Sequence, residues 1–219
     1  MILKIDVIDK DLVKSDFHQM YYDSDVWGGG NTTFLGLPIL KCPMDLWMYQ
    51  QIIHKVKPKV IIETGTHCGA SAYWLLCCMN MSSIKNKMVI TIDIEQMITF
   101  REPQITQIIG KSTHPDAVYT CMNIIKQLGG PVMVILDSDH SKENVLAELD
   151  LYAKFVTKDS YLIVEDTNVN GNPVAPEFGE GPKEALDEWL QEHNDEFEVD
   201  TKCEQFMVTF NPNGYLRRK

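Results

Sequence analysis

The sequence predicts an α/β fold built on a mostly parallel sheet. Three observations favour this fold: short apolar runs of strand length recur from Val60 onward, amphipathic stretches of helical length separate them, and acidic residues stand at or just past their ends. Strands separated by a helix normally lie parallel, because the helix carries the chain back across the sheet. The 219 residues are enough for one well-buried core, so we expect one structural unit.

The individual elements follow from the local pattern. The expected strands are 59–63, 88–93, 106–110, 131–136 and 160–165, and the expected helices between and after them are 70–81, 113–128, 141–156 and 181–193. Ser141 suits the N-cap of the helix that follows it. Residues 196–200 and 205–210 have the pattern of two further strands joined by a short link. Such a link predicts a hairpin, and therefore an antiparallel edge to the sheet.

The first 57 residues break this rhythm. They contain an acidic helix-like start, an aromatic and glycine segment at 27–30, and another helix at 43–57. We expect residues 1–57 to form a helical cap that contributes to substrate binding, and residues 58–219 to form the catalytic domain. The glycine segment at 27–30 and the loop 167–182, with its glycines and prolines, are both expected to be mobile elements that can close over a ligand.

Composition excludes several classes of partner. The chain has 20 basic and 31 acidic residues and a formal net charge of −11, which opposes attraction to nucleic acid or to an anionic membrane surface. Its longest apolar stretch, residues 72–79, is too short to span a bilayer, and the N-terminus does not have the pattern of a signal peptide. We therefore expect a cytoplasmic protein that acts on a neutral or cationic small molecule.

The segment 59–71 has the pattern of a nucleotide site. An apolar strand runs into Glu63, and a turn with Gly65 and Gly69 then opens an apolar helix. Glycine lets the backbone approach a ligand closely, and amide groups at a helix start attract negative charge. The turn has neither the full GxGxxG spacing nor the Lys-Ser ending of a phosphate-binding loop. Asp93 ends the next strand, where it can accept hydrogen bonds from a ribose diol, so a nucleoside-bearing cofactor is expected.

Carboxylates follow two further strands. Asp137 comes after strand 131–136, and Glu165 with Asp166 ends strand 160–165. Ligands of open parallel sheets collect at the carboxyl ends of the strands, and three unpaired carboxylates there would repel one another. A divalent cation would balance them, and oxygen donors favour magnesium over zinc. A hydrogen-bonded acidic cluster without an ion stays open as the alternative, and Asp139 is either a further ligand or a helix cap.

His140 is the candidate general base. It lies three residues past Asp137 at the start of an expected helix, and the unperturbed pKa of histidine, about 6.5, suits proton transfer at neutral pH. A histidine at a helix start can instead bond only to backbone, and this alternative stays open. His67 and His114 are expected to be peripheral.

Five motifs occur together over about residues 25 to 218: PMDLW at 43–47 followed by YQ, IETGT at 62–66, LDSDHS at 136–141, IVEDT at 163–167 and FNPNGYL at 210–216. Together they resemble the cephalosporin hydroxylase and macrolide-sugar O-methyltransferase family of metal-dependent class I S-adenosylmethionine methyltransferases. The resemblance implies a Rossmann-like class I methyltransferase fold: a mostly parallel seven-stranded sheet with an antiparallel edge strand and helices on both faces. Self-association as a homo-oligomer is also expected.

The resemblance also implies roles for particular residues. The cofactor-binding residues would be Glu63, Gly65, Thr66, Gly69, Ser71, Asp93, Ser112 and Asp137. Within this set Glu63, Gly65 and Ser71 would hold the methionine part of S-adenosylmethionine, Asp93 its ribose and Ser112 its adenine. Magnesium would be held by Asp137, Glu165 and Asp166, and His140 would stand in the place of the family's general base.

The expected function is magnesium-dependent transfer of a methyl group from S-adenosylmethionine to a hydroxyl of a small molecule, either a sugar or another vicinal diol. The ion would acidify the hydroxyl and His140 would remove its proton. Four aromatic side chains are candidates for the substrate pocket: Trp27, Phe34, Trp47 and Phe178, with core packing as the alternative for Trp47.

The sequence leaves one main alternative function open and argues against two others. A non-catalytic cofactor-binding or scaffold protein of the same fold is the main alternative, although such a protein is expected to have lost an acid or the base. An iron and 2-oxoglutarate hydroxylase needs two histidines and a carboxylate, and no histidine follows the HxD spacing at 193–195. A magnesium-dependent hydrolase is a weaker alternative, because the sequence has no phosphate-binding loop.

Overall fold

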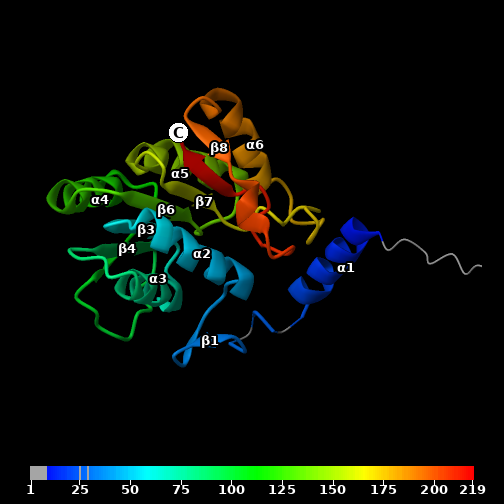
Figure 1. The fold of residues 1–219 in the computed structure, drawn as a ribbon, viewed down its shortest axis with the longest axis horizontal. Helices are drawn as coiled ribbons and strands as arrows, with labels where there is room; N and C mark the ends of the chain where they lie inside the picture. Colours follow the sequence, from blue (N-terminus) through cyan, green and yellow to red (C-terminus); the bar gives the residue numbers. More distant parts are fainter. Residues whose placement is uncertain (1–8, 25, 29) are drawn as a thin grey trace, which may run out of the picture.

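The computed structural model of the chain describes residues 9–24, 26–28 and 30–219 (Figure 1). Gly29, part of the expected aromatic and glycine segment, lies outside these residues, as do residues 1–8 of the expected cap. Within the described part, no helix combines the length and the apolar character needed to cross a bilayer.

A seven-stranded sheet forms the centre of the molecule, with the order β5-β4-β3-β6-β7-β9-β8. Its strands are β3 (Val60–Thr64), β4 (Met88–Asp93), β5 (Ile105–Ile109), β6 (Val132–Leu136), β7 (Tyr161–Val164), β8 (Phe197–Val199) and β9 (Tyr215–Arg218). The strands from β5 to β7 are parallel, and β9 is antiparallel to both β7 and β8. All residues of β3 and β6 are buried, as expected for central strands covered on both faces.

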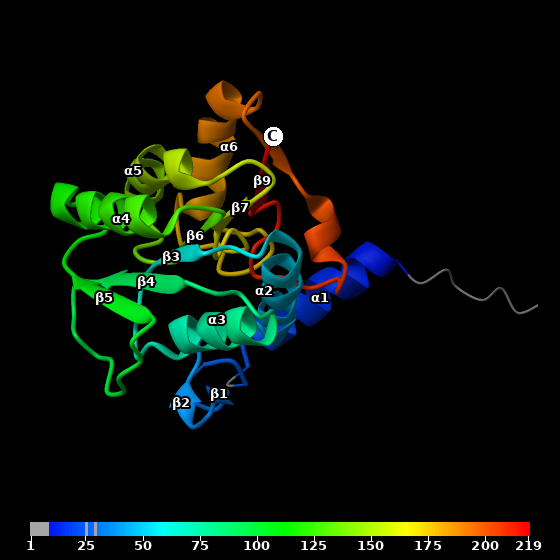
Figure 2. The same ribbon diagram turned by 60° about the vertical axis from the view of Figure 1, so that its left-hand side comes forward.

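Helices cover both faces of this sheet (Figure 2). They are α2 (Pro43–Val56), α3 (Ala70–Met81), α4 (Pro115–Leu128), α5 (Lys142–Tyr152) with the 3-10 turn η1 (Ala153–Phe155), and α6 (Pro182–His193). Because side chains alternate along a strand, Ile61 packs with the apolar residues of α2 and α3, whereas Val60 and Ile62 pack with those of α4, α5 and α6. The α/β class and the sheet expected from the sequence are confirmed.

The C-terminal part differs from the expectation in one respect. Residues 205–210 form no strand, and the 3-10 helix η2 (Thr201–Glu204) and turns fill the interval between β8 and β9. The predicted hairpin was therefore wrong in the position of its second strand. The reason is a buried carboxylate: Asp45 on α2 accepts hydrogen bonds from the Thr209 hydroxyl and, at 2.8 Å, from the backbone N–H of Phe210. These bonds hold the segment to α2, and the antiparallel strand, β9, lies one position in from the edge strand β8.

The N-terminal helix α1 (Lys10–Tyr22) lies at the side of the molecule (Figure 1). It packs against Phe210, whose ring stacks on His18 at a centroid distance of 5.7 Å and meets Tyr22 and Trp27 edge-on at 5.5 and 5.2 Å. The Nε2 atom of His18 lies 3.0 Å from the amide nitrogen of Asn168. The same segment that bonds to α2 thus also holds α1.

Between α1 and α2 in the sequence is a small antiparallel pair of strands, β1 (Thr33–Phe34) and β2 (Leu37–Pro38). It lies beside α3, where Phe34 contacts Tyr73 and Trp74 edge-on at centroid distances of 5.9 and 5.1 Å (Figure 2). From β2 the chain continues through Lys41 into α2.

Candidate active site

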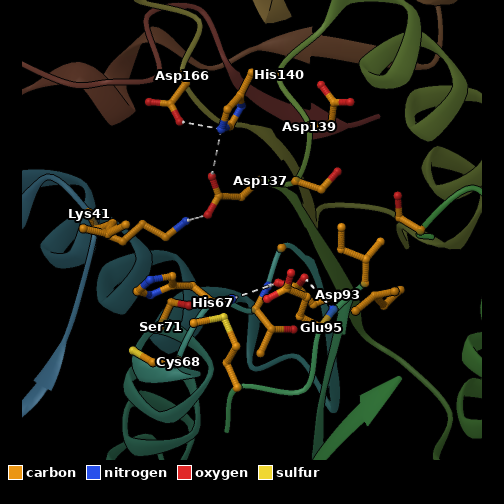
Figure 3. Close-up of a pocket in the computed structure, with 18 of the residues that line it drawn as sticks. Lys41, His67, Cys68, Ser71, Asp93, Glu95, Asp137, Asp139, His140 and Asp166 are labelled. Carbon is orange, nitrogen blue, oxygen red and sulfur yellow. Dashed lines mark hydrogen bonds and ion pairs between the residues drawn. The ribbon is translucent and has the colours of Figure 1, made fainter. Parts of the chain in front are cut away.

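A pocket of about 700 Å³ opens at the carboxyl ends of β3, β4 and β6, and residues that follow β7 complete its wall (Figure 3). Six of the predicted cofactor-binding residues line it: Gly65, Thr66, Ser71, Asp93, Ser112 and Asp137. The predicted base His140 and the acid Asp166 line it too. The pocket therefore opens at the edge of the sheet where ligands of parallel sheets collect.

The glycine turn after β3 requires glycine at its first position. Gly65 has a φ of +80°, and a Cβ at this residue would lie 1.8 Å from the carbonyl oxygen of Asp137. Asp93 fixes the turn, because one of its carboxylate oxygens accepts hydrogen bonds from the backbone N–H groups of Thr66 at 2.8 Å and His67 at 2.9 Å. The turn, β4 and the end of β6 are thereby held together at the pocket, with His67 at its rim.

Glu63 and Gly69 stand behind the pocket surface. Glu63 is fully buried, and Thr91 donates a hydrogen bond to one of its oxygens at 3.0 Å. The other oxygen makes no hydrogen bond of good geometry among the residues that the structure describes, although the Ser71 side chain is near enough to oppose the rise in the pKa of Glu63. Burial raises the pKa of Glu63 to about 7, against the opposing effect of the positive charge of Lys41. An orphaned carboxylate oxygen beneath a pocket is an acceptor that a ligand's ammonium group would satisfy.

Ser112 is also buried, and it lines the pocket. Its carbonyl oxygen accepts a hydrogen bond from the Tyr152 hydroxyl at 2.6 Å, which ties the loop after β5 to α5. Gly110, Lys111 and Thr113 line the pocket next to it. The predicted adenine contact at this position stays a prediction.

The acidic residues and His140 form one cluster. The Nε2 atom of His140 lies 3.2 Å from an oxygen of Asp166 and 3.8 Å from an oxygen of Asp137. Potential ligand atoms of these three residues all lie within 4.8 Å of one another, which is a spacing that suits one metal ion. Two carboxylates and an imidazole are a donor set that a divalent cation can use.

The charges in this cluster determine the protonation of His140. Burial alone would lower the pKa of His140, but the negative charges of Asp166 and Asp137 outweigh burial and raise this pKa above its ordinary value. Burial raises the pKa of Asp137 and Asp166 as well. A cation among these groups would reverse both tendencies, favouring ionised carboxylates and a neutral imidazole that can accept a proton.

Lys41 is a site residue that the sequence analysis missed. Its side chain is 4% exposed, and its ammonium group forms an ion pair with Asp137 (Figure 3). It forms a second ion pair with Glu165. Glu165 is thereby turned toward Lys41, and it is not among the atoms that approach His140. Whether Glu165 binds an ion stays a prediction. The available signal was a lysine two residues before the motif at 43–47, but this lysine does not follow a strand of the main sheet.

A second residue that was missed, Glu148 of α5, holds the loop that carries Asp137. The Thr64 hydroxyl donates to Glu148 at 3.2 Å and accepts from the backbone N–H of Asp137 at 3.1 Å. The Ser138 hydroxyl donates to the other oxygen of Glu148 at 2.6 Å. The signal in the sequence was an acid on the buried face of an amphipathic helix. This network fixes the backbone on both sides of the Asp137 side chain.

Asn211 performs the same task for Asp166. The backbone N–H of Asp166 donates to the Asn211 side chain at 3.1 Å, and the Asn211 amide donates to the Tyr49 hydroxyl at 2.8 Å. Asp166 has a φ of +54°, an uncommon conformation for a residue other than glycine. Such strain persists where surrounding contacts enforce it, and it is common at functional sites.

Three other polar residues singled out from the sequence lie at helix starts: Asp139, Ser141 and His114. Asp139 accepts a hydrogen bond from the backbone N–H of Ser141 at 2.9 Å, which is the cap alternative considered from the sequence. Ser141 is the N-cap residue of α5 by position, although its own side chain makes no capping hydrogen bond. His114 caps α4, where its Nδ1 accepts from the backbone N–H of Asp116 at 3.3 Å.

Two of the four aromatic residues predicted for the substrate pocket line it, and two do not. Trp27 and Phe178 line the pocket, together with Tyr22 of α1. Phe34 packs on α3 instead, and Trp47 is 56% exposed on α2, away from the pocket lining. Tyr22 and Trp27 contact each other at a centroid distance of 5.1 Å, and Phe178 lies beside Gly181 close to the backbone of His140, so aromatic side chains form part of the pocket wall.

Comparison with known proteins identifies the family. The family model described as Rhamnosyl O-methyltransferase/CmcI matches residues 28–219. A rhamnosyl O-methyltransferase of Mycobacterium leprae (strain TN) is 37% identical over 213 residues, which cover 95% of this chain and 92% of the relative. A rhamnosyl O-methyltransferase of Mycobacterium tuberculosis (strain CDC 1551 / Oshkosh) is 35% identical over 213 residues, covering 95% and 86%.

Solved structures agree on the fold. A CmcI structure described with Mg and SAM superimposes with a TM-score of 0.67 at 20% identity, over 88% of this chain and 78% of that one. A Staphylococcus aureus structure described as a caffeoyl-CoA O-methyltransferase superimposes with a TM-score of 0.54 at 17% identity, over 73% and 78%. The class I methyltransferase-like fold implied by the sequence motifs is confirmed. The chain belongs to the rhamnosyl O-methyltransferase/CmcI family, and the enzyme class expected from its sequence, an S-adenosylmethionine-dependent O-methyltransferase, is confirmed with it.

Proposed function

We propose that this methyltransferase requires a divalent cation, Mg²⁺ by preference, and methylates a hydroxyl of a sugar or another vicinal diol. One observation carries the proposal: the cluster of Asp137, His140 and Asp166 lines the same pocket as the glycine turn. The names of the mycobacterial relatives, which specify a rhamnosyl group, support a sugar acceptor. A vicinal diol suits the site because two adjacent oxygens can chelate one ion.

The residues fit both ligands. The pocket volume of about 700 Å³ lies within the usual range for small-molecule sites. Gly65, Asp93 and Ser112 lie where a nucleoside and its methionine tail would contact backbone and carboxylate, and the unpartnered oxygen of Glu63 would accept from the ammonium group of the methionine tail. Asp137 and Asp166 would hold the cation, with Glu165 as the third carboxylate.

A divalent cation held by Asp137 and Asp166 would lower the pKa of a substrate hydroxyl bound to it. His140 Nε2 would accept the hydroxyl proton, and the carboxylate of Asp166, 3.2 Å from that nitrogen, would stabilise the imidazolium that forms. The aromatic wall of Tyr22, Trp27 and Phe178 excludes water and positions the acceptor near the methyl donor. Residues 1–57 contribute two of these side chains, which supports a substrate-binding role for the N-terminal segment.

Self-association is part of the proposal. Leu12, Val13 and Met20 of α1 are each more than half exposed, and a helix that presents apolar side chains on its outer face is typical of an interface between copies. Sedimentation or light scattering of the purified protein tests this point.

The decisive test is methyl transfer from labelled S-adenosylmethionine to simple rhamnosides, with Mg²⁺ and with EDTA. We expect transfer to rhamnosides that have a free vicinal diol, loss of transfer in EDTA, and restoration by added Mg²⁺. Asp137→Asn should abolish transfer while leaving the protein folded. Binding of S-adenosylmethionine without transfer to any diol, in the presence of Mg²⁺, would instead support the non-catalytic alternative.

A further inference from the structure

Lys41 occupies an unusual position for a lysine. Its side chain is 4% exposed, and it reaches from the segment between β2 and α2 into the carboxyl end of the sheet. Lysine is almost never buried without a partner, and here two carboxylates supply partners. They come from residues 96 and 124 positions away in the sequence, so this contact exists only in the folded chain.

The ammonium group lies among acidic residues with few positive neighbours. Four buried or half-buried carboxylates surround it or lie nearby: Glu63, Asp137, Glu165 and Asp166. Lys41 contacts two of them, and His140 contacts the other side of the cluster. A single positive charge therefore offsets much of the negative charge of the site.

The two oxygens of Asp137 divide the cluster. One oxygen faces Lys41, and the other lies 3.8 Å from His140. Glu165 gives one oxygen to Lys41. An ion coordinated by Asp137 and Glu165 from β6 and β7 would bridge the same two carboxylates that the ammonium group bridges, and two cations cannot share these oxygens without strong repulsion.

We propose that Lys41 is the resident cation of the metal site: its ammonium group bridges Asp137 and Glu165 before the divalent cation binds, and the ion displaces it. This inference rests on the proposed function only in so far as that function requires an ion. A displaced Lys41 releases Glu165 to serve as the third oxygen ligand, which reconciles the three-carboxylate set expected from the sequence with the Asp137, His140 and Asp166 grouping in the structure.

Displacement of the Lys41 side chain would also affect the pocket wall. Pro38, Ile39 and Leu40, which precede Lys41, line the same pocket as Lys41 itself. The Pro38 carbonyl accepts a hydrogen bond from the Cys68 thiol at 2.9 Å, which ties this segment to the glycine turn. The ion would therefore change the position of a segment that contacts both the cofactor turn and the metal site.

The first test follows the reactivity of Lys41 in the wild-type protein. An amine-reactive reagent and peptide mass spectrometry would measure labelling in EDTA and in saturating Mg²⁺, while Mn²⁺ titration followed by electron paramagnetic resonance shows whether an ion binds. We expect labelling of Lys41 to rise several-fold with the ion. Lys111, which lines the same pocket but is exposed, is the internal control and should change little.

The second test compares Lys41→Met with Lys111→Met. Removal of the competing charge should tighten Mn²⁺ binding by about tenfold in Lys41→Met, and by much less in Lys111→Met. Lys41→Met should also have a lower melting temperature in EDTA and a larger upward shift with Mg²⁺, because its carboxylates then lack a counter-ion until the ion binds.

The outcomes separate the two proposals. If wild-type protein binds no divalent cation, metal dependence is wrong and the role of Lys41 is wrong with it. If the ion binds but Lys41 stays protected, displacement alone is overturned and the proposed function survives. If Lys41→Met does not fold, the labelling experiment on the wild-type protein still decides.

Discussion

Thr64→Val tests whether the network beneath Asp137 holds this part of the site. Thr64 is fully buried at the end of β3, and its hydroxyl both accepts from the backbone N–H of Asp137 at 3.1 Å and donates to Glu148 at 3.2 Å. Valine has nearly the same shape and cannot form either bond. The substitution therefore removes two hydrogen bonds without opening a cavity.

The magnitude follows from those two bonds. Each contributes about 1 kcal/mol, and the Asp137 N–H left without a partner adds about 1 kcal/mol, so the free energy of unfolding should fall by about 3 kcal/mol. For a domain of this size the melting temperature falls by about 2–4 °C per kcal/mol, which gives about 6–12 °C in total. Because Asp137 would lose a backbone restraint, Mn²⁺ binding should weaken as well.

The assay is thermal unfolding of Thr64→Val beside a matched control, Thr106→Val. Thr106 lies on β5, and its hydroxyl contacts the sulfur of Met88 at 3.3 Å, which is a weak bond. The control should unfold within about 2 °C of the wild type, since a weak bond contributes little. Equal melting temperatures for the two variants would refute the role assigned to the Thr64 and Glu148 network.

Three further predictions concern other parts of the molecule. His140→Gln should lower kcat by about 10²–10⁴-fold with little change in the dissociation constant for S-adenosylmethionine, as measured by calorimetry; an unchanged kcat would exclude His140 as the base. Gly65→Ala should abolish cofactor binding, because the new Cβ would collide with the Asp137 carbonyl, and retained binding at wild-type affinity would contradict that geometry. Burial lowers the pKa of His18 from 6.5 to about 4, so the unfolded chain binds a proton that the folded chain does not, and the packing of α1 on Phe210 should lose up to about 3 kcal/mol as the pH falls from 6.5 to 4. Tryptophan fluorescence across that range should show the loss in the wild type, and His18→Gln should have a flatter profile.

The sheet could be predicted because its strands are buried on both faces. Runs such as 59–63 and 131–136 are apolar without interruption, and a short apolar run between two amphipathic stretches has few other structures available to it. The start of α3 at Ala70 could also be predicted, because a glycine turn precedes the apolar helical stretch. In the structure Gly69 adopts a φ of +81° just before the helix. The strand predicted at 205–210 was wrong because the apolar side chains of this segment pack in a loop against α1 and α2 and not within a sheet.

The candidate site was predictable where the parallel-sheet rule applies. Asp93, Asp137 and Asp166 each follow a strand, so their convergence follows from topology alone. Lys41 and Asn211 reach the same place from segments outside that rule, and their contacts depend on how α2 and the C-terminal segment pack. Local pattern contains no information about such packing.

The position of β9 within the sheet constrains the order in which the enzyme can mature. β8 pairs with β9, and β7 also pairs with β9, so β8 cannot join the sheet until the later residues Tyr215–Arg218 have been synthesised. The loop before β9 carries Asn211, which holds the backbone of Asp166. During translation β3 to β7 emerge first, whereas Asp166 acquires its final backbone geometry only when this last segment inserts. A nascent chain would therefore lack both the hydrogen bond that holds Asp166 and the core contacts of Tyr215 and Leu216 until its last residues have left the ribosome.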